Sequence, residues 1–316
     1  MNIGFIGLGN VGAKLAGSLV RNGFPLVVRD LNPAAAAPLL AQGASWADTP
    51  RALAATADVI ITCLPSPAVV SEVMEAEEGV IAGLAPGKIW LEMSTTDETE
   101  VKRLAALVQA AGAVALDAPV SGGCHRAATG NISILVGGER AAFEKVLPAL
   151  TVMGRRILHT GALGSASVLK VITNYLCSVH LVALGEALMT AKRAGMDLRT
   201  TFEAIRISSG NSFVHETESQ VILNGSYNIN FTMDLVVKDM SLFNALAERY
   251  ALPLELSPMV LDIFKDGRAR YGDRAWSSMI VKRLEDACGT DLRADGFPEE
   301  LTDDEAESPG YEVVPR

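Results

Sequence analysis

The chain opens on Ile3-Gly4-Phe5-Ile6-Gly7-Leu8-Gly9-Asn10-Val11-Gly12, a short apolar run that breaks into a Gly-x-Gly-x-x-Gly turn and continues into a helical pattern. Gly7 permits a tight turn after the strand, Gly9 lets the backbone approach a pyrophosphate, and Gly12 lets the next helix pack on the sheet. The N-terminus of that helix would face the phosphates. The stretch therefore predicts a βαβ unit that binds NAD or NADP, with these residues at the cofactor: Gly7, Leu8, Gly9, Asn10, Val11 and Gly12.

A second strand-like run, Pro25 to Arg29, is followed by Asp30. Asp30 lies where the dinucleotide pattern expects an acid that bonds the ribose 2′-hydroxyl, and its charge would repel a 2′-phosphate. Arg29 could accommodate such a phosphate, but its side chain points to the opposite face of the strand. We therefore expect NAD as the preferred cofactor, with NADP possible.

Alternating strand-like and helix-like segments run to about residue 160. Such alternation predicts a Rossmann-type, doubly wound and mainly parallel sheet over residues 1–161, an α/β fold. After Gly161 the strand signals stop, and long helical periodicity predicts an all-α domain over residues 162–289. The apolar runs that carry the strand prediction are 59–64, 88–92, 113–117, 132–136 and 156–160.

The formal charge of −10 is concentrated at the C-terminus, where residues 290–316 hold nine acids and two arginines and so contribute −7. With three prolines and few apolar residues, this segment is expected to be a flexible acidic tail, and a role in subunit contact is the alternative. The sequence shows no basic patch, so we expect no nucleic-acid partner.

Cysteine spacing and the apolar segments bear on the compartment. The four cysteines show no CxxC spacing and no paired histidines, which argues against disulfides and against a metal site. Met1 leads directly into the first strand and leaves no room for a signal peptide. The apolar stretch 171–191 contains Asn174, His180 and Glu186, which favour a buried helix over a membrane span. We therefore expect a cytoplasmic protein without membrane contact.

Ligands of an open α/β sheet bind beyond the carboxyl ends of its strands. Leu64-Pro65 follows the third strand-like run, Ser94-Thr95 the fourth, and Ser121-Gly122-Gly123 the fifth. A hydroxyl followed by two unobstructed backbone N–H groups can hold a carboxylate, although Ser and Gly also dominate ordinary turns. Ser121, Gly122 and Gly123 are therefore candidate ligands of an anionic substrate.

Lys170 and Asn174 are four residues apart at the start of the helical half, so they share one helical face. A lysine on an otherwise apolar stripe is costly unless it has a partner or a task. Beside a nicotinamide ring that task is acid–base chemistry at the oxygen of the reacting carbon. The alternative is a lysine whose ammonium extends to the surface.

Together these segments resemble the β-hydroxyacid dehydrogenases, the family of 3-hydroxyisobutyrate dehydrogenase and tartronate semialdehyde reductase. The resemblance covers Asn2 to about Gly289 and rests on the glycine turn, 117–123, 161–174 and 231–239, in family order and spacing. It implies hydride transfer between NAD(P) and a small β-hydroxy acid, or reduction of the matching semialdehyde.

The resemblance also implies roles for single residues. Lys170 matches the catalytic lysine, Asn174 its polar companion, and Ser121, Gly122 and Gly123 the site of the substrate carboxylate. Thr95, or Ser94 beside it, matches the hydroxyl near the nicotinamide, and Lys238 matches the lysine that closes over the cofactor. Leu64 and Pro65 are further candidate cofactor ligands, because of their place after the third strand-like run. The family further implies a homodimer or homotetramer built through the long helix that begins near Leu163.

Departures from the family pattern bear on the substrate. Ala166 stands where the family usually has a third glycine, and the segment 124–131 contains His125 and Arg126 where relatives carry small or neutral residues. Arg126 could anchor a second anionic group of the substrate or be a solvated loop cation. His125 could be a second proton donor or bond a backbone carbonyl. Four residues of the helical half could also reach the cleft: Arg206, Asn211, Ser212 and Trp276.

Two other functions remain as alternatives. One is an imine reductase, and the other is a non-catalytic nucleotide-binding partner protein. The lysine is typically another residue in the first group and is lost in the second, so Lys170 argues against both.

Overall fold

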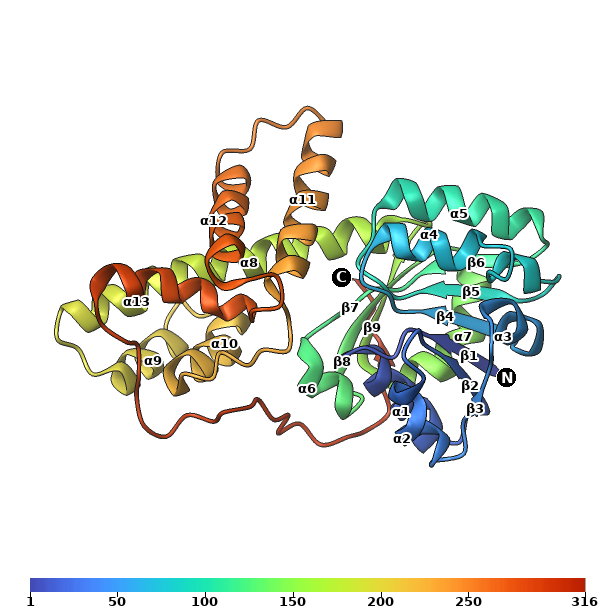
Figure 1. The fold of residues 1–316 in the computed structure, drawn as a ribbon, viewed down its shortest axis with the longest axis horizontal. Coiled ribbons are helices and arrows are strands. Elements are labelled where there is room, and N and C mark those ends of the chain that lie inside the picture. Colours follow the sequence, from blue (N-terminus) through green and yellow to red (C-terminus); the bar gives the residue numbers. More distant parts are fainter. Residues whose placement is uncertain (316) are drawn as a thin grey trace. The chain divides into compact units, whose positions relative to one another are not determined.

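The computed structural model describes residues 1–315, and these residues form two compact units (Figure 1). The first unit comprises Met1–Lys170 together with the chain from Asp303 onward, and the second comprises Val171–Thr302. The two compact units divide after Lys170, inside a helix, while the predicted boundary at residue 161 lies just before that helix. The reason is local, since the sheet residue Asp117 bonds Gly164 and Ser167 and thereby attaches the first turn of that helix to the first unit.

The first unit contains one sheet, and its predicted Rossmann-type, mainly parallel character is confirmed. Strand order is β10-β9-β8-β6-β5-β4-β1-β2-β3, with β7 paired to β8, and only the pairs β6–β8 and β7–β8 are antiparallel. The order reverses between β1 and β4, which creates a ligand crevice at their carboxyl ends. The strands are β1 Ile3–Ile6, β2 Leu26–Arg29, β3 Ser45–Trp46, β4 Val59–Thr62, β5 Ile89–Glu92, β6 Val114–Asp117, β7 Val120–Ser121, β8 Ile132–Gly137, β9 Gly154–Gly161 and β10 Tyr311–Glu312.

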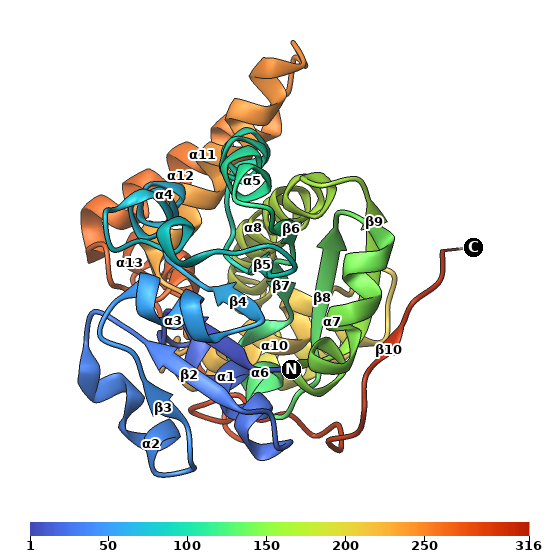
Figure 2. The same cartoon turned by 90° about the vertical axis from the view of Figure 1, so that its right-hand side faces the viewer.

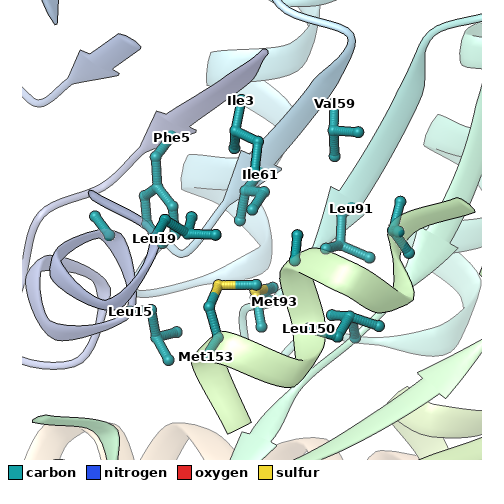
Figure 3. Packing of buried hydrophobic residues seen from close by; sticks show 14 of the residues in the cluster. Ile3, Phe5, Leu15, Leu19, Val59, Ile61, Leu91, Met93, Leu150 and Met153 are labelled. Atoms are coloured by element: carbon teal, nitrogen blue, oxygen red, sulfur yellow. The ribbon is translucent and has the colours of Figure 1, made fainter. Parts of the chain in front are cut away.

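Helices cover both faces of this sheet because its strands are apolar on both sides, as parallel strands are. Ile3 and Phe5 of β1 pack with helices α1 and α7 on one face, and Figure 3 shows these side chains pointing toward Leu19 and Met153. Alternate strand residues such as Trp90 pack on the other face. The helices are α1 Gly12–Arg21, α2 Ala37–Leu40, α3 Pro50–Thr56, α4 Pro67–Glu75, α5 Glu98–Ala110, α6 Gly123–Ala128 and α7 Arg140–Met153, with 3-10 turns η1 Pro33–Ala36 and η2 Ile81–Gly83.

The second unit is helical, as predicted. Its core gathers Leu188 of α8, Met240 of α11 and Phe264 of α12, all fully buried. Within the described residues, α8 is the one helix long and apolar enough to cross a membrane by length and composition. Leu181, Leu184 and Leu188 of α8 lie in the core, and about a third of the apolar stretch of this helix is buried. The elements are α8 Ser165–Arg193, α9 Leu198–Arg206, α10 Phe213–Asn224, α11 Met233–Arg249, α12 Leu256–Tyr271, η3 Ser277–Val281 and α13 Lys282–Cys288.

The acidic C-terminal segment differs from the flexible tail expected for residues 290–316. Within the second unit Leu292 is fully buried, and its N–H donates to Glu285 Oε1 at 2.7 Å. Within the first unit Tyr311–Glu312 pairs in parallel with β9, and Figure 2 shows this red segment running outside α7 and β9. Net charge alone misled the prediction, because arginines far apart in the sequence line the path of the segment.

Candidate functional site

The glycine turn between β1 and α1 has the shape that a pyrophosphate requires. Gly7 has a φ of +99°, and a side chain there would collide with the carbonyl of Cys63. A side chain at Gly12 would collide with the carbonyl of Gly7, whereas one at Gly9 would meet nothing within 4 Å. The turn therefore has no room for side chains at Gly7 and Gly12, where strand and helix meet. It is open at Gly9, where the pyrophosphate of a dinucleotide approaches the backbone. Helix α1 also begins without a side-chain cap, so its first N–H groups suit a phosphate.

Asp30 lies at the carboxyl end of β2 and is held against this turn. Its Oδ2 accepts a hydrogen bond from the N–H of Leu8 at 2.6 Å, and its Oδ1 accepts one from Asn32 at 2.8 Å. Carboxylate oxygens retain further lone pairs, which can accept ribose hydroxyls. Arg29 donates to the carbonyl of Asp30 and places its guanidinium carbon 5.1 Å from the ring centroid of Trp46.

The ends of β4 and β5 are joined through Ser94. Its hydroxyl accepts from the N–H of Leu64 at 2.8 Å, and its own N–H donates to Glu92 Oε1 at 2.6 Å. Ser94 is buried by these contacts, whereas Thr95 is half-exposed. Of the two hydroxyls predicted near the nicotinamide, that of Thr95 is therefore the more exposed. Pro65 is exposed beside Leu64, just before helix α4.

Glu92 is a buried carboxyl beneath this loop that sequence reasoning missed. Trp90 Nε1 donates to Thr62 Oγ1 at 2.9 Å, and that hydroxyl donates to Glu92 Oε2 at 2.5 Å. Burial raises the pKa of Glu92 to about 7, although the bonds from Ser94 and Thr62 oppose the rise. The network fixes the start of the Ser94-Thr95 loop, and a Glu ending an apolar strand was the only sequence signal for it.

The segment from Ser121 to Arg126 runs from the end of β7 through Gly122 into the first turn of α6. Gly122 and Gly123 have φ values of +126° and +89°, which glycine adopts readily. The His125 ring lies over Gly123, and the Arg126 side chain lies over Gly122, with Cδ 3.5 Å from where a β-carbon would stand. The structure thus brings the predicted carboxylate ligands and Arg126 together.

His125 is held uncharged in this turn. Burial lowers its pKa, the charge of Arg126 lowers it further, and Asp303 opposes both effects. A neutral imidazole can donate or accept a proton in a hydrogen bond but offers no positive charge to an anionic substrate. Arg126 is therefore the cation of this turn.

Lys170 lies in the second turn of α8, whose start is fixed by Asp117 at the end of β6. Asp117 Oδ1 accepts from Gly164 N at 2.8 Å, and its Oδ2 accepts from the N–H and the hydroxyl of Ser167 at 2.7 and 2.8 Å. A negative charge is favourable at a helix N-terminus. Asp117 is fully buried and Lys170 is 7% exposed. Asp117 opens the segment 117–123 that carries the family resemblance, but nothing in the sequence marks it as the residue that positions α8.

Asn174 and Lys238, on α8 and α11 of the second unit, share the carboxylate of Asp239. Asn174 Nδ2 donates to Asp239 Oδ2 at 2.5 Å, and Lys238 Nζ lies 2.7 Å from Asp239 Oδ1. Asp239 is buried. The structure thus brings two predicted site residues together through a third that the sequence analysis did not single out, although it stands next to Lys238.

The other candidates of the helical half have local roles. Arg206 is exposed and ion-pairs with Glu203 at 2.7 Å. Ser212 caps α10 by accepting from the N–H of His215. Asn211, just before α10, donates a hydrogen bond to Glu216 of that helix. Trp276 forms an isolated antiparallel β-bridge with Thr232. No group of three or more His, Cys, Asp and Glu side chains suited to a metal ion occurs within residues 1–315.

Two family models match the chain in succession. The NAD binding domain of 6-phosphogluconate dehydrogenase matches residues 2–161, and the NAD-binding domain of NADP-dependent 3-hydroxyisobutyrate dehydrogenase matches residues 164–284. Among curated relatives, 2-(hydroxymethyl)glutarate dehydrogenase of Eubacterium barkeri is 33% identical over 92% of this chain and 97% of its own. NAD-dependent L-serine dehydrogenase of Pseudomonas aeruginosa is 34% identical over 90% and 97%.

Solved structures agree with these matches. The 3-hydroxyisobutyrate dehydrogenase of Mycobacterium tuberculosis with L-serine has a TM-score of 0.81 at 29% identity and covers 90% of this chain and 98% of its own. Psf3 in complex with NADP+ and 2-OPP has a TM-score of 0.80 at 25% identity, over 89% and 99%. An imine reductase from Myxococcus stipitatus is 19% identical with a TM-score of 0.62, over 90% and 99%, and shares the fold alone.

Proposed function

Since the chain belongs to the β-hydroxyacid dehydrogenase family, whose members are NAD(P)-dependent oxidoreductases acting on hydroxyl groups, we propose that Lys170 is its catalytic acid–base residue. The supporting observation is a buried lysine side chain on a helix whose first turn is fixed to the sheet by Asp117. In the oxidative direction the Lys170 amine accepts the hydroxyl proton of the acid. In the reverse direction the ammonium returns it to the semialdehyde oxygen.

The remaining site residues bind and orient. When bound, NAD(P) supplies the hydride acceptor or donor. The Ser121 hydroxyl and the N–H groups of Gly122 and Gly123 hold the substrate carboxylate. Thr95 lies near the nicotinamide, and Asn174, four residues beyond Lys170 on α8, orients the substrate. No metal has a role in this proposal, because the lysine itself polarises the oxygen.

The cofactor is NAD in preference to NADP, because the Asp30 carboxylate stands where a 2′-phosphate would bring a second negative charge. We expect kcat/KM with NAD to exceed that with NADP by about tenfold or more, since close like charges cost several kcal/mol. Asp30→Asn should lower the ratio of kcat/KM with NAD to kcat/KM with NADP. Asp58→Asn should leave this ratio unchanged, because Asp58 precedes β4 and so lies at the amino end of the parallel strands, whereas Asp30 lies at their carboxyl end. Steady-state kinetics with both cofactors measures it, and equal values for the unsubstituted chain would contradict the preference.

The substrate is a small β-hydroxy acid that carries a second anionic group, bound by Arg126. Arg126 lies over Gly122, beside the proposed carboxylate site, and a guanidinium pairs with a carboxylate, sulfonate or phosphonate in bidentate fashion. The relative from Eubacterium barkeri bears a name that specifies a dicarboxylate, 2-(hydroxymethyl)glutarate. L-serine, in the name of another relative, has a single carboxylate and serves as the contrast.

The test compares 2-(hydroxymethyl)glutarate, 3-hydroxyisobutyrate and L-serine in an NAD-linked absorbance assay. Arg126→Ala should lower kcat/KM for the dicarboxylate by about 100-fold, the loss expected for a buried charge pair, and by less than about threefold for the other two acids. Arg206→Ala is the matched control, because Arg206 pairs with Glu203 on an exposed surface. Equal losses on all three acids would contradict an anchor for a second anion.

We also propose a cytoplasmic homodimer or homotetramer. Leu176 on α8 is 45% exposed, and Met259 on α12 is 60% exposed, in the helical unit to which the family assigns subunit contacts. Burial of such side chains against a second copy of the chain would remove apolar surface from water, which favours association. Light scattering of the purified chain determines the state.

A further inference from the structure

A segment beyond the family models lies against the proposed substrate turn. The family models end at residue 284, whereas residues 303–315, here named the C-terminal strap, belong to the first unit. Arg140 binds Glu312 of the strap through both nitrogens, at 2.5 and 2.9 Å, and Arg155 bonds the carbonyl of Pro309 at 2.9 Å. The strap is thus fixed along α7 and β9 (Figure 2).

At the start of the strap, Asp303 holds two residues at the end of α6. Its Oδ2 accepts from Thr129 Oγ1 at 2.5 Å and from Asn131 Nδ2 at 2.8 Å. The same Asn131 amide donates to the carbonyl of Glu305 at 2.7 Å. Asn131 is fully buried, so the loss of these acceptors would leave its amide unsatisfied in a site away from water.

Thr129 and Asn131 also contact the backbone carbonyl of Arg126, at the carboxyl end of α6. The Asn131 N–H donates to the Arg126 carbonyl at 2.8 Å, and Thr129 Oγ1 lies 3.2 Å from the same oxygen. Helix α6 has six residues, a length at which helical hydrogen bonds alone do not hold the chain. The position of Arg126 therefore depends on contacts at the carboxyl end of α6, and Asp303 supplies two of them.

Charge acts in the same direction. Partial burial alone would raise the pKa of Asp303, but bonds from Thr129 and Asn131 and the charge of Arg126 hold it below its usual range. Asp303 is therefore ionised at neutral pH and attracts Arg126 from the side of the strap. A carboxylate is the stronger acceptor for both bonds.

We propose that Asp303 is a positioning residue of the substrate site, which fixes the end of α6 through Thr129 and Asn131 and so orients Arg126. The inference rests on the proposed function, because it assigns to Arg126 the second anionic group of the substrate. Under this proposal the strap, which lies outside the family models, helps to determine which substrates the protein prefers.

The test uses the full-length chain with saturating NAD and 2-(hydroxymethyl)glutarate as the probe. Asp303→Ala should raise the KM for this acid about tenfold, because Thr129 and Asn131 both lose their charged acceptor and Arg126 is no longer oriented, with kcat within about twofold. Asp303→Asn keeps one acceptor oxygen and should restore part of the loss. Glu312→Gln is the matched control, since it weakens the strap at Arg140 and should leave KM unchanged.

Two further measurements separate the possible failures. In an Arg126→Ala background, Asp303→Ala should raise KM no further. If Asp303→Ala raised KM as much in that background as in the unsubstituted chain, the positioning role would be overturned. A rise in KM of the same size in Glu312→Gln would overturn it as well. Amide hydrogen exchange at Asn131 should accelerate about tenfold in Asp303→Ala, without dependence on turnover. Unchanged exchange would overturn the hold on α6, whereas no turnover of any tested acid by the unsubstituted chain would overturn the proposed function instead.

Discussion

Lys170→Ala is expected to lower kcat for hydroxy acid oxidation by about a thousandfold, within the usual range for loss of a general acid or base. The dissociation constant for NAD should stay within about twofold, because the dinucleotide is held by the glycine turn between β1 and α1 and by Asp30 just after β2. Steady-state turnover measures the first quantity, and titration of the intrinsic fluorescence with NAD measures the second.

The matched control for Lys170→Ala is Lys265→Ala, which removes an exposed lysine that pairs with Asp262 on α12. It should leave both quantities unchanged. If Lys170→Ala retained the turnover of the unsubstituted chain, the assignment of the acid–base residue would be wrong. A parallel loss of NAD binding would instead indicate a damaged fold.

Asp117→Ala is expected to lower the free energy of unfolding by about 3 kcal/mol, because a buried N-terminal cap and a charge-assisted bond are lost together. Gly164 and Ser167 would keep buried donors without acceptors. Turnover should fall as well, since Lys170 lies one turn further along the same helix. Urea unfolding followed by circular dichroism measures the stability.

Asp97→Ala provides the comparison, because Asp97 caps α5 through bonds to the N–H groups of Thr99 and Glu100 at its surface. A surface cap contributes about 1 kcal/mol, so this variant should lose less stability and keep its turnover. If Asp97→Ala and Asp117→Ala lost equal amounts of stability and turnover, neither the burial of Asp117 nor its place beside Lys170 would contribute to its effect.

The fold was largely predictable because its signals are local. The glycine turn at Gly7, Gly9 and Gly12 and the alternation of apolar runs with helical periodicity predicted the Rossmann-type sheet and the helical second unit, and both are confirmed. The antiparallel pairing of β8 and the addition of β10 at the edge were not predicted. Both depend on contacts between residues far apart in sequence, which periodicity does not report.

The carboxylates around the site illustrate the same limit. Asp117, Glu92 and Asp239 act by accepting hydrogen bonds from backbone or side-chain donors that the fold brings to them. An acid in a sequence gives no sign of such donors. Asp303 was counted only as one charge of an acidic tail, because its partners Thr129 and Asn131 lie in another part of the chain.

The central claim is that the Lys170 amine carries the proton while the acid is oxidised. The most direct test is chemical rescue, in which turnover of Lys170→Ala with saturating NAD and 2-(hydroxymethyl)glutarate is measured against added methylamine. We predict that turnover rises with the concentration of the free amine, while the unsubstituted chain is unaffected. A Lys170→Ala variant that turns over as fast as the unsubstituted chain without methylamine would contradict the claim.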